Sequence, residues 1–232
     1  MLSINLYVIY LSIEINQKKN VRLMKKKILV LHSGGLDSTV CLFTALNSGS
    51  EVVSLGIDYG QRHRVELEYA NNQCALHNIE RKLVKLEWDK PIREMPVDRS
   101  IEEIKANVSS AFLPGRNLTF FSIACAEAAG VGADEVWTGI NAVDFSGYPD
   151  CTPDFFNSFR STLSLAMPDG PQLLAPLLFK TKPEIALMAK NIGINKGDTW
   201  SCYRPNFHTD GISPCAKCDA CKLHNYAWEN SE

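Results

Sequence analysis

The sequence predicts an α/β fold in which helices cover both faces of a parallel sheet. Two observations predict this class. Short apolar runs alternate with stretches of helical character along the chain. The apolar runs are continuous rather than interrupted by polar residues at every second position, as expected for strands that are buried on both faces. A length of 232 residues also fits one domain with a small appendage.

The first part of the chain has the pattern of a β-α-β unit followed by a further helix and strand. A helix stop signal, Asn47-Ser48-Gly49, separates the first predicted helix from the second predicted strand. The expected elements are, in order, a strand at 27–32, a helix at 38–46, a strand at 51–57, a helix with Leu67, Ala70 and Cys74 on one face, and a strand at 82–88.

The rest of the chain continues the alternation. The expected elements are a helix at 118–129, a strand at 134–138, a helix at 154–165 and a helix at 183–191 that begins with Pro183. The least regular segments are 89–116 and 139–152. Because loops beyond the carboxyl ends of parallel strands line the ligand crevice, we expect the functional site there and at the end of the first strand.

Composition and charge narrow the function classes. Residues 1–23 contribute +2, so residues 24–232 contribute −4 to the formal net charge of −2. Binding to a phosphate backbone depends on clustered Lys and Arg. Because residues 24–232 carry a net negative charge, a nucleic-acid substrate is disfavoured. Eight Cys in a chain of this size are not needed as covalent staples, and we expect a reducing cytoplasm. Four of them are scattered: Cys41, Cys74, Cys125 and Cys151.

Residues 1–23 form an apolar extension with polar interruptions. It is too short and too polar for a spanning helix, and its basic residues follow the apolar stretch, whereas a signal peptide has them before it. We expect a mis-assigned start with Met24 as the initiator. A translated extension that pairs with another chain is the alternative, which mass spectrometry of the native N-terminus distinguishes.

A glycine-rich hexapeptide, SGGLDS at 33–38, follows the first predicted strand and leads into a helix. Its glycines permit a backbone that turns successive N–H groups inward, its serines add hydroxyl donors, and the helix N-terminus supplies positive partial charge. The Gly-Lys-Ser/Thr ending of a Walker loop is absent from it. A plain glycine turn is the alternative. The place of the hexapeptide as the first strand-to-helix turn favours a phosphate-binding loop.

Four further cysteines crowd the C-terminus with the spacing C-x12-C-x2-C-x2-C: Cys202, Cys215, Cys218 and Cys221. Short spacings let neighbouring thiolates converge on one ion, and a distant fourth completes the tetrahedron that Zn²⁺ prefers in structural sites. An iron–sulfur cluster is the alternative, although no C-x3-C-P completes that pattern. We expect one structural zinc per chain. His208 is an alternative ligand that we expect, like His224, to have no part in the site.

The hexapeptide resembles the loop of the N-type ATP pyrophosphatases, the PP-loop enzymes, which cleave ATP between the α and β phosphates. The resemblance implies a Rossmann-like PP-loop sheet, Mg²⁺ with ATP, and a loop that holds the departing pyrophosphate while an adenylated intermediate forms. It implies catalytic roles for Ser33, Asp37 and Ser38, with helix capping as the alternative for Asp37. It also implies ATP contacts along one stretch: His32, Ser33, Gly34, Gly35, Leu36, Asp37, Ser38, Thr39, Val40, Cys41 and Leu42.

Three more segments extend the resemblance: DYGQRH at 58–63, LPGRN at 113–117 and GINAVDFSGYPDC at 139–151. With the loop and the terminal cysteines, they are similar to the 7-cyano-7-deazaguanine synthase family of the queuosine pathway, in order over about residues 25–223. That similarity implies a ligase that converts 7-carboxy-7-deazaguanine, ammonia and ATP to 7-cyano-7-deazaguanine (preQ0), with release of AMP and pyrophosphate. Two features depart from the family: the extension, and the long stretch between Cys202 and Cys215.

The segment 139–151 fits a substrate site on physical grounds as well. A deazapurine acid presents a flat ring, donors at the ring edge and a carboxylate, which suit an aromatic ring, carboxylates and an arginine. The candidate substrate residues are Arg116, Asn141, Asp144, Tyr148 and Asp150. A polar loop and a surface arginine are the alternatives.

We therefore expect an extension at 1–23, a PP-loop ATP-binding and substrate domain at 24–198, and a zinc module at 199–232 packed on that domain. The expected partners are small molecules, without nucleic acid or membrane, and the resemblance implies a homodimer. Two other function classes stay open. A tRNA thiolase shares the loop but needs an RNA-binding surface and a sulfur-carrying Cys, and a non-enzymatic zinc-ribbon module leaves the loop unexplained.

Overall fold

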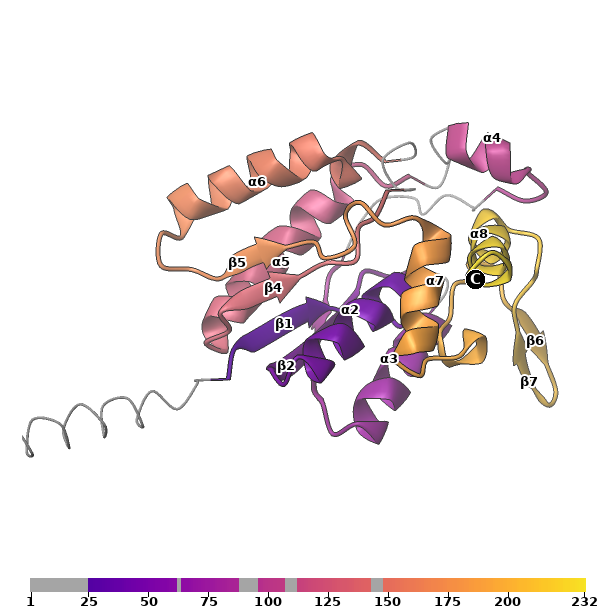
Figure 1. Cartoon of the computed structure of the whole chain (residues 1–232), viewed down its shortest axis with the longest axis horizontal. Helices are drawn as coiled ribbons and strands as arrows, with labels where there is room; N and C mark the ends of the chain where they lie inside the picture. The colour runs from indigo at the N-terminus through magenta and orange to yellow at the C-terminus, as the bar shows by residue number, and fades with distance from the viewer. Residues whose placement is uncertain (1–24, 62–63, 88–95, 107–111, 143–147) are drawn as a thin grey trace, which may run out of the picture.

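The computed structural model describes residues 25–61, 64–87, 96–106, 112–142 and 148–232, so the extension lies outside the described residues. Its centre is a sheet of five parallel strands in the order β3-β2-β1-β4-β5 (Figure 1). The strands are β1 (Lys27–Leu31), β2 (Glu51–Asp58), β3 (Glu80–Lys85), β4 (Glu135–Trp137) and β5 (Gln172–Leu174). The predicted parallel α/β class is confirmed.

Seven described helices accompany the sheet: α2 (Leu36–Asn47), α3 (Val65–Leu76), α4 (Ile101–Ala106), α5 (Arg116–Gly130), α6 (Pro153–Ala166), α7 (Lys182–Asn191) and α8 (Asp219–Glu229). Two short 3-10 turns, η2 (Pro149–Cys151) and η3 (Lys196–Asp198), stand before α6 and after α7. The expected helices at 38–46, 118–129, 154–165 and 183–191 correspond to α2, α5, α6 and α7. The helices α4 and α8 and the strand β5 were not expected.

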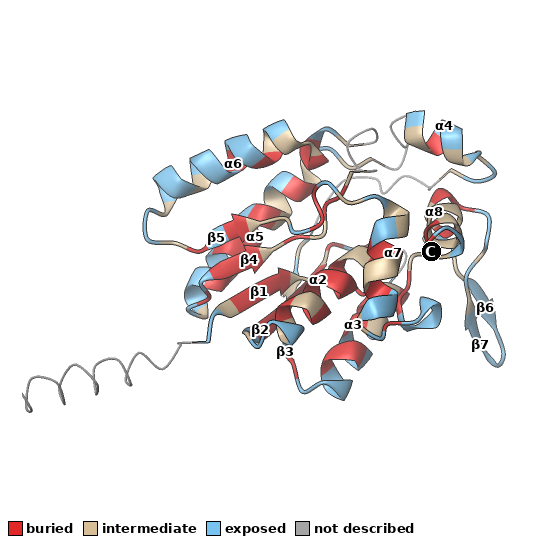
Figure 2. Ribbon diagram, viewed as in Figure 1, coloured by how far each residue is buried: buried red, intermediate tan, exposed pale blue. Residues whose placement is uncertain are grey.

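The strand residues face two separate hydrophobic clusters, one on each side of the sheet. Ile28 and Val30 point toward the side covered by α2 and α7, whereas Leu29, between them, packs with α5 and α6. Figure 2 shows the strands of the centre buried, with exposed residues on the outer faces of the helices. Successive side chains of a strand point to opposite faces of the sheet, and here both faces are covered by apolar residues. The strand sequences are therefore continuous apolar runs.

The strand order places a topological switch point at β1. The chain runs from β1 outward to β2 and β3 on one side, and later returns to place β4 and β5 on the other side. Loops that leave β1 and β4 therefore diverge at their carboxyl ends, which is where open α/β sheets bind ligands. The sequence motifs at 33–38 and 139–151 both leave from this point.

A β-hairpin accounts for the long stretch between Cys202 and Cys215. Two antiparallel strands, β6 (Asn206–His208) and β7 (Gly211–Ser213), pair with Phe207 opposite Ile212. They project beside α8 in Figure 1. The extra residues thus form a β-hairpin whose two ends lie near the cysteines.

The C-terminal residues pack directly on the sheet domain. The Trp200 N–H donates a hydrogen bond of 3.0 Å to the carbonyl oxygen of Gly34, and the Gln73 side-chain amide donates to the Asp198 carbonyl at 2.6 Å. A third hydrophobic cluster joins Val65 of α3 to Trp200 and the buried cysteines. These contacts fit a module on the same domain, while the division at residue 198 stays a prediction.

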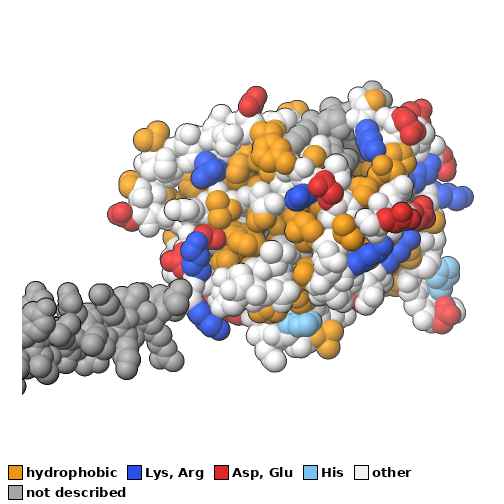
Figure 3. Space-filling view, viewed as in Figure 1, with side chains coloured by type: hydrophobic (Ala, Val, Ile, Leu, Met, Phe, Trp, Pro, Cys, Tyr) orange, Lys and Arg blue, Asp and Glu red, His pale blue; other side chains and the backbone are white. Residues whose placement is uncertain are grey.

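The surface carries both signs of charge. Lys and Arg side chains are interspersed with Asp and Glu on the face seen in Figure 3. In the part of the chain that the structure describes, no helix is both long enough and apolar enough to span a membrane.

Candidate active site and metal centre

The loop at 33–38 lies between the end of β1 and the first turn of α2, and its two serines hold it in shape. Ser33 Oγ and Ser38 Oγ lie 3.2 Å apart, and the Ser33 N–H donates to Ser38 Oγ at 3.2 Å. The Gly35 N–H donates to Ser33 Oγ at 3.3 Å, and Ser38 Oγ donates to the Gly35 carbonyl at 3.2 Å. Hydroxyls and backbone amides thus gather around one turn at a helix N-terminus, which suits phosphate oxygens.

Two glycines permit this turn for steric reasons. Gly34 has a φ of +94°, and a Cβ there would lie 2.2 Å from the carbonyl oxygen of Glu66 on α3. At Gly139, which follows β4, a Cβ would lie 3.0 Å from the Ser38 nitrogen. Only glycine lets α3 and the end of β4 approach the loop this closely.

Asp37, the predicted catalytic carboxylate, forms an ion pair with a residue that the sequence did not single out. Lys182 Nζ lies 2.6 Å from Asp37 Oδ2, and both side chains are largely buried. Asp37 Oδ1 is shielded from solvent and has no hydrogen-bond partner among the described residues. The pair therefore supplies a cation and a partly unsatisfied carboxylate at the loop.

The position of Lys182 follows from a capping box at the start of α7. The Glu184 N–H donates to Thr181 Oγ1 at 3.4 Å, and the Thr181 N–H donates to Glu184 Oε2 at 2.8 Å. Such a reciprocal pair fixes the first turn of a helix. In the sequence, the Thr-x-x-Glu spacing at 181–184 and Pro183 mark this helix start.

His32, at the end of β1, is buried and belongs to a polar network under the loop. Its Nε2 lies 2.8 Å from Gln73 Oε1 and its Nδ1 lies 3.0 Å from Ser54 Oγ. Arg81 donates to the His32 carbonyl at 3.1 Å and to Ser54 Oγ at 2.7 Å. Burial, together with the charge of Arg81, lowers the pKa of His32 to about 3. The ring is therefore neutral at physiological pH and positions the loop.

One cavity of about 330 Å³ opens from this loop. Its wall includes loop residues after β1, residues after β4, the start of α5, the start of α7 and the first turns of α8. The lining residues on the loop side are His32, Ser33, Gly35, Leu36, Asp37, Ser38 and Lys182. Lining residues from other segments include Arg99, Arg116, Tyr148, Tyr203, Asp219 and His224. One cavity thus joins the phosphate loop to the C-terminal module.

The cavity divides the stretch that was predicted to contact ATP. Thr39, Val40, Cys41 and Leu42 do not line it and are buried where α2 packs on the sheet. Cys41 Sγ donates to the Thr138 carbonyl at 3.7 Å, and burial raises its pKa. In the structure, all four side chains are buried. Contacts between them and ATP stay a prediction.

Arg116, predicted to meet a phosphate or carboxylate, lies among tyrosines at the cavity wall. Its Cζ lies 5.8 Å from the ring centroid of Tyr148. Burial alone would lower its pKa, but the phenols of Tyr59, Tyr203 and Tyr148 outweigh this, and the pKa is raised overall. The guanidinium is thus a fixed positive charge with aromatic neighbours.

The other predicted substrate residues are spread more widely. Asp150 Oδ2 accepts from the Asn117 N–H at 2.9 Å and so caps α5, and Asp150 does not line the cavity. Asn141 is buried and its amide donates to the Gly139 carbonyl at 3.4 Å, also outside the lining. Asp144 lies outside the described residues. Substrate contacts of all three stay predictions.

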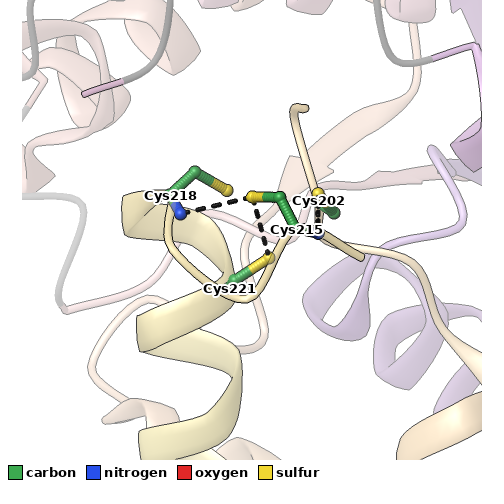
Figure 4. A group of neighbouring side chains, drawn as sticks. All are labelled: Cys202, Cys215, Cys218 and Cys221. Atoms are coloured by element: carbon green, nitrogen blue, oxygen red, sulfur yellow. Dashed lines mark hydrogen bonds between the residues drawn. The ribbon is translucent and has the colours of Figure 1, made fainter. Parts of the chain in front are cut away.

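The four C-terminal cysteines converge on one point (Figure 4). Their Sγ atoms all lie within 4.8 Å of one another, and Cys215 Sγ lies 3.9 Å from Cys221 Sγ. Backbone amides of Arg204 and Cys215 donate to Cys202 Sγ at 3.3 and 3.2 Å. Cys218 and Cys221 come from the start of α8, and the hairpin β6–β7 separates the other two.

This geometry fits a tetrahedral metal ion. Four ligands at a Zn–S distance of about 2.3 Å place sulfur atoms about 3.8 Å apart, close to the observed separation of Cys215 and Cys221. The amide donors to sulfur are the kind of contacts that orient metal ligands. The expected cluster of four cysteines able to hold a metal ion is therefore confirmed.

Neither nearby histidine belongs to this cluster of described residues. His208 is exposed in the hairpin, where its Nε2 lies 2.8 Å from Ser213 Oγ. His224 lines the cavity instead, with its Nδ1 3.1 Å from Ser201 Oγ, and burial lowers its pKa. Both agree with the expectation that neither is a ligand.

Comparison with known proteins gives a match over almost the whole chain. Residues 27–232 match the family model described as queuosine biosynthesis protein QueC. A relative from Rhodopseudomonas palustris (strain HaA2), named 7-cyano-7-deazaguanine synthase 2, is 53% identical over 88% of this chain and 98% of its own length. The 7-cyano-7-deazaguanine synthase of Thermoplasma volcanium is 37% identical over 86% of this chain and 85% of its own length.

Solved structures align less closely. The structure of NMN synthetase from Francisella tularensis aligns with a TM-score of 0.48 and 16% identity, over 75% of this chain and 64% of that chain.

Proposed function

The chain belongs to the QueC family of queuosine biosynthesis proteins, and we propose from this that it is an ATP-dependent carbon–nitrogen ligase making 7-cyano-7-deazaguanine. Its substrates are 7-carboxy-7-deazaguanine, ammonia and ATP, and the nucleotide products are AMP and pyrophosphate. The observation that carries the proposal beyond the family is the cavity that the loop at 33–38 lines together with Arg116 and Tyr148.

The chemistry needs two activated oxygens, because a carboxylate loses both oxygens on its way to a nitrile. The carboxylate oxygen attacks the α phosphorus of ATP, and pyrophosphate leaves. Ammonia then displaces AMP from the acyl adenylate to give the amide. The amide oxygen attacks a second ATP in the same way, and loss of AMP with two protons gives the nitrile. The same cavity serves both rounds.

The residues of the loop act on the leaving group. Ser33, Ser38 and the backbone amides of the turn donate to the oxygens of the departing pyrophosphate. Lys182 neutralises charge there while its pairing with Asp37 holds both side chains at the loop. Magnesium, when bound with ATP, supplies further charge neutralisation, and Asp37 Oδ1 is the oxygen available to meet it or its water ligands.

Arg116 and Tyr148 act on the second substrate. Arg116 is positioned to attract the substrate carboxylate, and the ring of Tyr148 offers a flat surface for the deazapurine. Orientation of the carboxylate toward the α phosphorus is the main contribution expected from such groups.

The cysteine cluster is proposed to hold one structural zinc through Cys202, Cys215, Cys218 and Cys221. With four thiolates the coordination shell is closed, so the ion would stabilise the fold around the cavity and would not bind substrate. We further propose that the protein works in the cytoplasm as a homodimer on small molecules, without a nucleic-acid partner.

Product analysis tests the proposal. Purified protein is incubated with ATP, Mg²⁺, ammonium and 7-carboxy-7-deazaguanine, and the products are identified by mass spectrometry. The nitrile is expected, and its formation must depend on ATP. ATP cleavage to AMP without any nitrile would contradict the proposed substrate. It would indicate an ATP pyrophosphatase that transfers AMP to another substrate.

A further inference from the structure

Asp219 lies between two metal-binding cysteines and also faces the cavity. It is the first residue of α8, directly after Cys218 and two positions before Cys221, whose side chains Figure 4 shows at the start of that helix. Only 3% of Asp219 is exposed, and it lines the same cavity as the loop at 33–38. The module that holds the metal site therefore also forms part of the substrate cavity.

The two carboxylate oxygens of Asp219 have different surroundings. Oδ2 accepts hydrogen bonds from both Nε, at 3.0 Å, and Nη2 of Arg99. Oδ1 is shielded from solvent and has no hydrogen-bond partner among the described residues. A buried acceptor without a partner costs free energy, so such an atom at a ligand cavity indicates a donor that arrives with the ligand.

Arg99 makes this carboxylate rigid. Its guanidinium lines the cavity beside Asp219, and its carbonyl oxygen accepts from Lys222 Nζ at 2.6 Å. The hydrogen bond to Asp219 and, more weakly, the nearby phenol of Tyr148 raise the pKa of Arg99. Arg99, Asp219 and Tyr148 are therefore neighbours on the wall of the cavity that the phosphate loop also lines.

The other carboxylates near the cavity have different partners. Asp37 also has an unpartnered Oδ1, but its Oδ2 pairs with Lys182 at the phosphate loop. Glu66 lies close to Gln61, whose amide donates to it at 3.4 Å. Asp150, the acceptor predicted from the sequence, caps α5 through Asn117 and does not line the cavity. Among the carboxylates described in the structure, Asp37 and Asp219 both line the cavity and keep a buried acceptor without a partner, and Asp219 is the one that lies outside the phosphate loop.

We propose that Asp219 is a specificity-determining residue that accepts a hydrogen bond at Oδ1 from the exocyclic amino group of the deazaguanine ring. This inference rests on the proposed function. It assigns Arg99 as a positioning residue, and it makes the cysteine module a part of substrate recognition. The ring would lie beside Tyr148 with its amino edge toward α8, and its carboxylate would point toward Arg116 and the loop.

The isosteric variant Asp219→Asn tests the proposal. An asparagine keeps an oxygen for Arg99 but presents an NH₂ group where Oδ1 stood, so that two donors oppose each other. We expect the KM for 7-carboxy-7-deazaguanine to rise about 10- to 100-fold, as for loss of a charged hydrogen bond, while the KM for ATP stays within about twofold. Zinc content and the thermal midpoint, measured on the same sample, report whether the module is intact.

A substrate analogue sharpens the test. The wild-type protein should discriminate by kcat/KM against the carboxy-deazapurine that lacks the exocyclic amino group, and Asp219→Asn should lose most of this discrimination. Asp219→Glu, which keeps the charge but moves the carboxylate, should also raise the substrate KM with zinc retained. This second variant serves if the first does not fold.

A matched control comes from the contact between α8 and α4. Lys105→Gln removes the hydrogen bond of 3.4 Å that Lys105 Nζ donates to the Tyr226 hydroxyl, and neither residue lines the cavity. Its KM values and its discrimination should equal those of the wild type. If Lys105→Gln shows the same defect as Asp219→Asn, the defect comes from the packing of α8 and the proposal is wrong.

The remaining outcomes are also decisive. An unchanged substrate KM and unchanged discrimination in Asp219→Asn would overturn the proposal, as would a rise in the KM for ATP alone, which would place Asp219 at the nucleotide. These results require that the wild type makes the nitrile. A wild type that makes none would contradict the proposed function itself, and the two failures are therefore distinguishable.

Discussion

Lys182 at the start of α7 donates a hydrogen bond of 2.6 Å to Asp37 in the first turn of α2, across 145 positions of the chain. The contact joins two helix N-termini at one phosphate-binding loop. Because α2 and α7 pack in the same hydrophobic cluster, the relative position of the two side chains is fixed by the core. The loop is thus completed by a residue from the last third of the sequence.

Loss of the Lys182 charge should slow catalysis. Lys182→Met keeps the length of the side chain and removes the cation, so we expect kcat to fall about 10²- to 10³-fold, as for other preorganised groups at a developing charge. AMP release measured by chromatography checks this. Lys180→Gln is the control, because Lys180 is half exposed and pairs with Glu184 on the surface. An equal loss in both variants would contradict a specific role of Lys182.

Substitution of Gly34 should disrupt the loop. Gly34→Ala brings a Cβ to 2.2 Å from the Glu66 carbonyl oxygen at a φ of +94°, so loop and helix α3 must separate. We expect a loss of roughly 3 kcal/mol in the free energy of unfolding and a clear rise in the KM for ATP. Gly49→Ala has a similar φ of +81° but meets no atom within 4 Å, so it should cost only about 1–2 kcal/mol. Urea denaturation compares the two, and equal losses would exclude the steric explanation.

The buried His32 should make stability depend on pH. Its pKa is about 3 in the folded protein, against an ordinary value of 6.5, because burial and Arg81 disfavour the charged ring. Above the ordinary value, both states are neutral and the full stability is present. As the pH falls below it, the unfolded chain takes up a proton that the folded protein does not, so stability decreases until the folded ring also titrates near pH 3.

The variant His32→Gln isolates this effect. Well below the ordinary pKa, the free energy of unfolding of the wild type should fall by about 1.4 kcal/mol per pH unit more steeply than that of His32→Gln. Urea midpoints at several pH values between about 6 and 4 give the two slopes. His208→Asn, which changes an exposed ring in the hairpin, should keep the wild-type slope. Parallel curves for wild type and His32→Gln would show that His32 is not held neutral.

The stoichiometry of ATP use follows from the two oxygens that are removed. Two AMP and two pyrophosphate are expected per nitrile, with an amide intermediate that is itself a substrate. Quantification of nucleotides and nitrile in one sample gives the ratio. ADP and phosphate as products, or one AMP per nitrile, would refute the mechanism even if the nitrile is made. Asp37→Ala and Ser38→Ala should abolish both rounds together, because one loop serves both.

The metal content distinguishes zinc from iron. Elemental analysis should give about one zinc per chain, and iron with visible absorption would overturn the assignment. Cys202→Ser should lower metal content, solubility and thermal stability more than it changes ATP affinity, because a closed site does not bind nucleotide. Cys125→Ala removes a buried thiol on α5, away from the cluster, and should retain the metal.

The sequence predicted the central elements because their signals are local. The continuous apolar runs of β1 and β2, the helix stop after α2 and the glycines of the loop each lie within a few residues of one another. The spacing of the cysteines likewise predicted their convergence. Prediction was poorer where the segments are short or carry another motif: β5 has only three residues and α4 only six, and α8 begins within the cysteine motif.

The missing parts of the site are contacts between distant segments. Lys182, Arg81, Arg99 and Asp219 are ordinary charged residues in the sequence, and each gains its role from a partner that only the fold brings near. The sequence around Asp219 predicts a metal site, because Cys218 and Cys221 flank it, and it gives no separate signal for a role of the carboxylate. Conversely, Thr39 to Leu42 directly follow the loop in the sequence, and the structure buries their side chains within α2, so that ATP contacts from them stay a prediction.

The switch-point arrangement of the sheet has a consequence for synthesis of the chain. On its β4 side, β1 is paired by hydrogen bonds such as that of 2.8 Å from the Asp134 N–H to the Lys27 carbonyl, and these two residues are 107 positions apart. At about 5–20 residues per second, a ribosome exposes that edge of β1 for roughly 5–20 seconds before β4 emerges. During this interval an apolar strand edge is available to other chains. Slower translation across residues 28–134 should therefore increase aggregation of the nascent protein, whereas slowing after β5 should not.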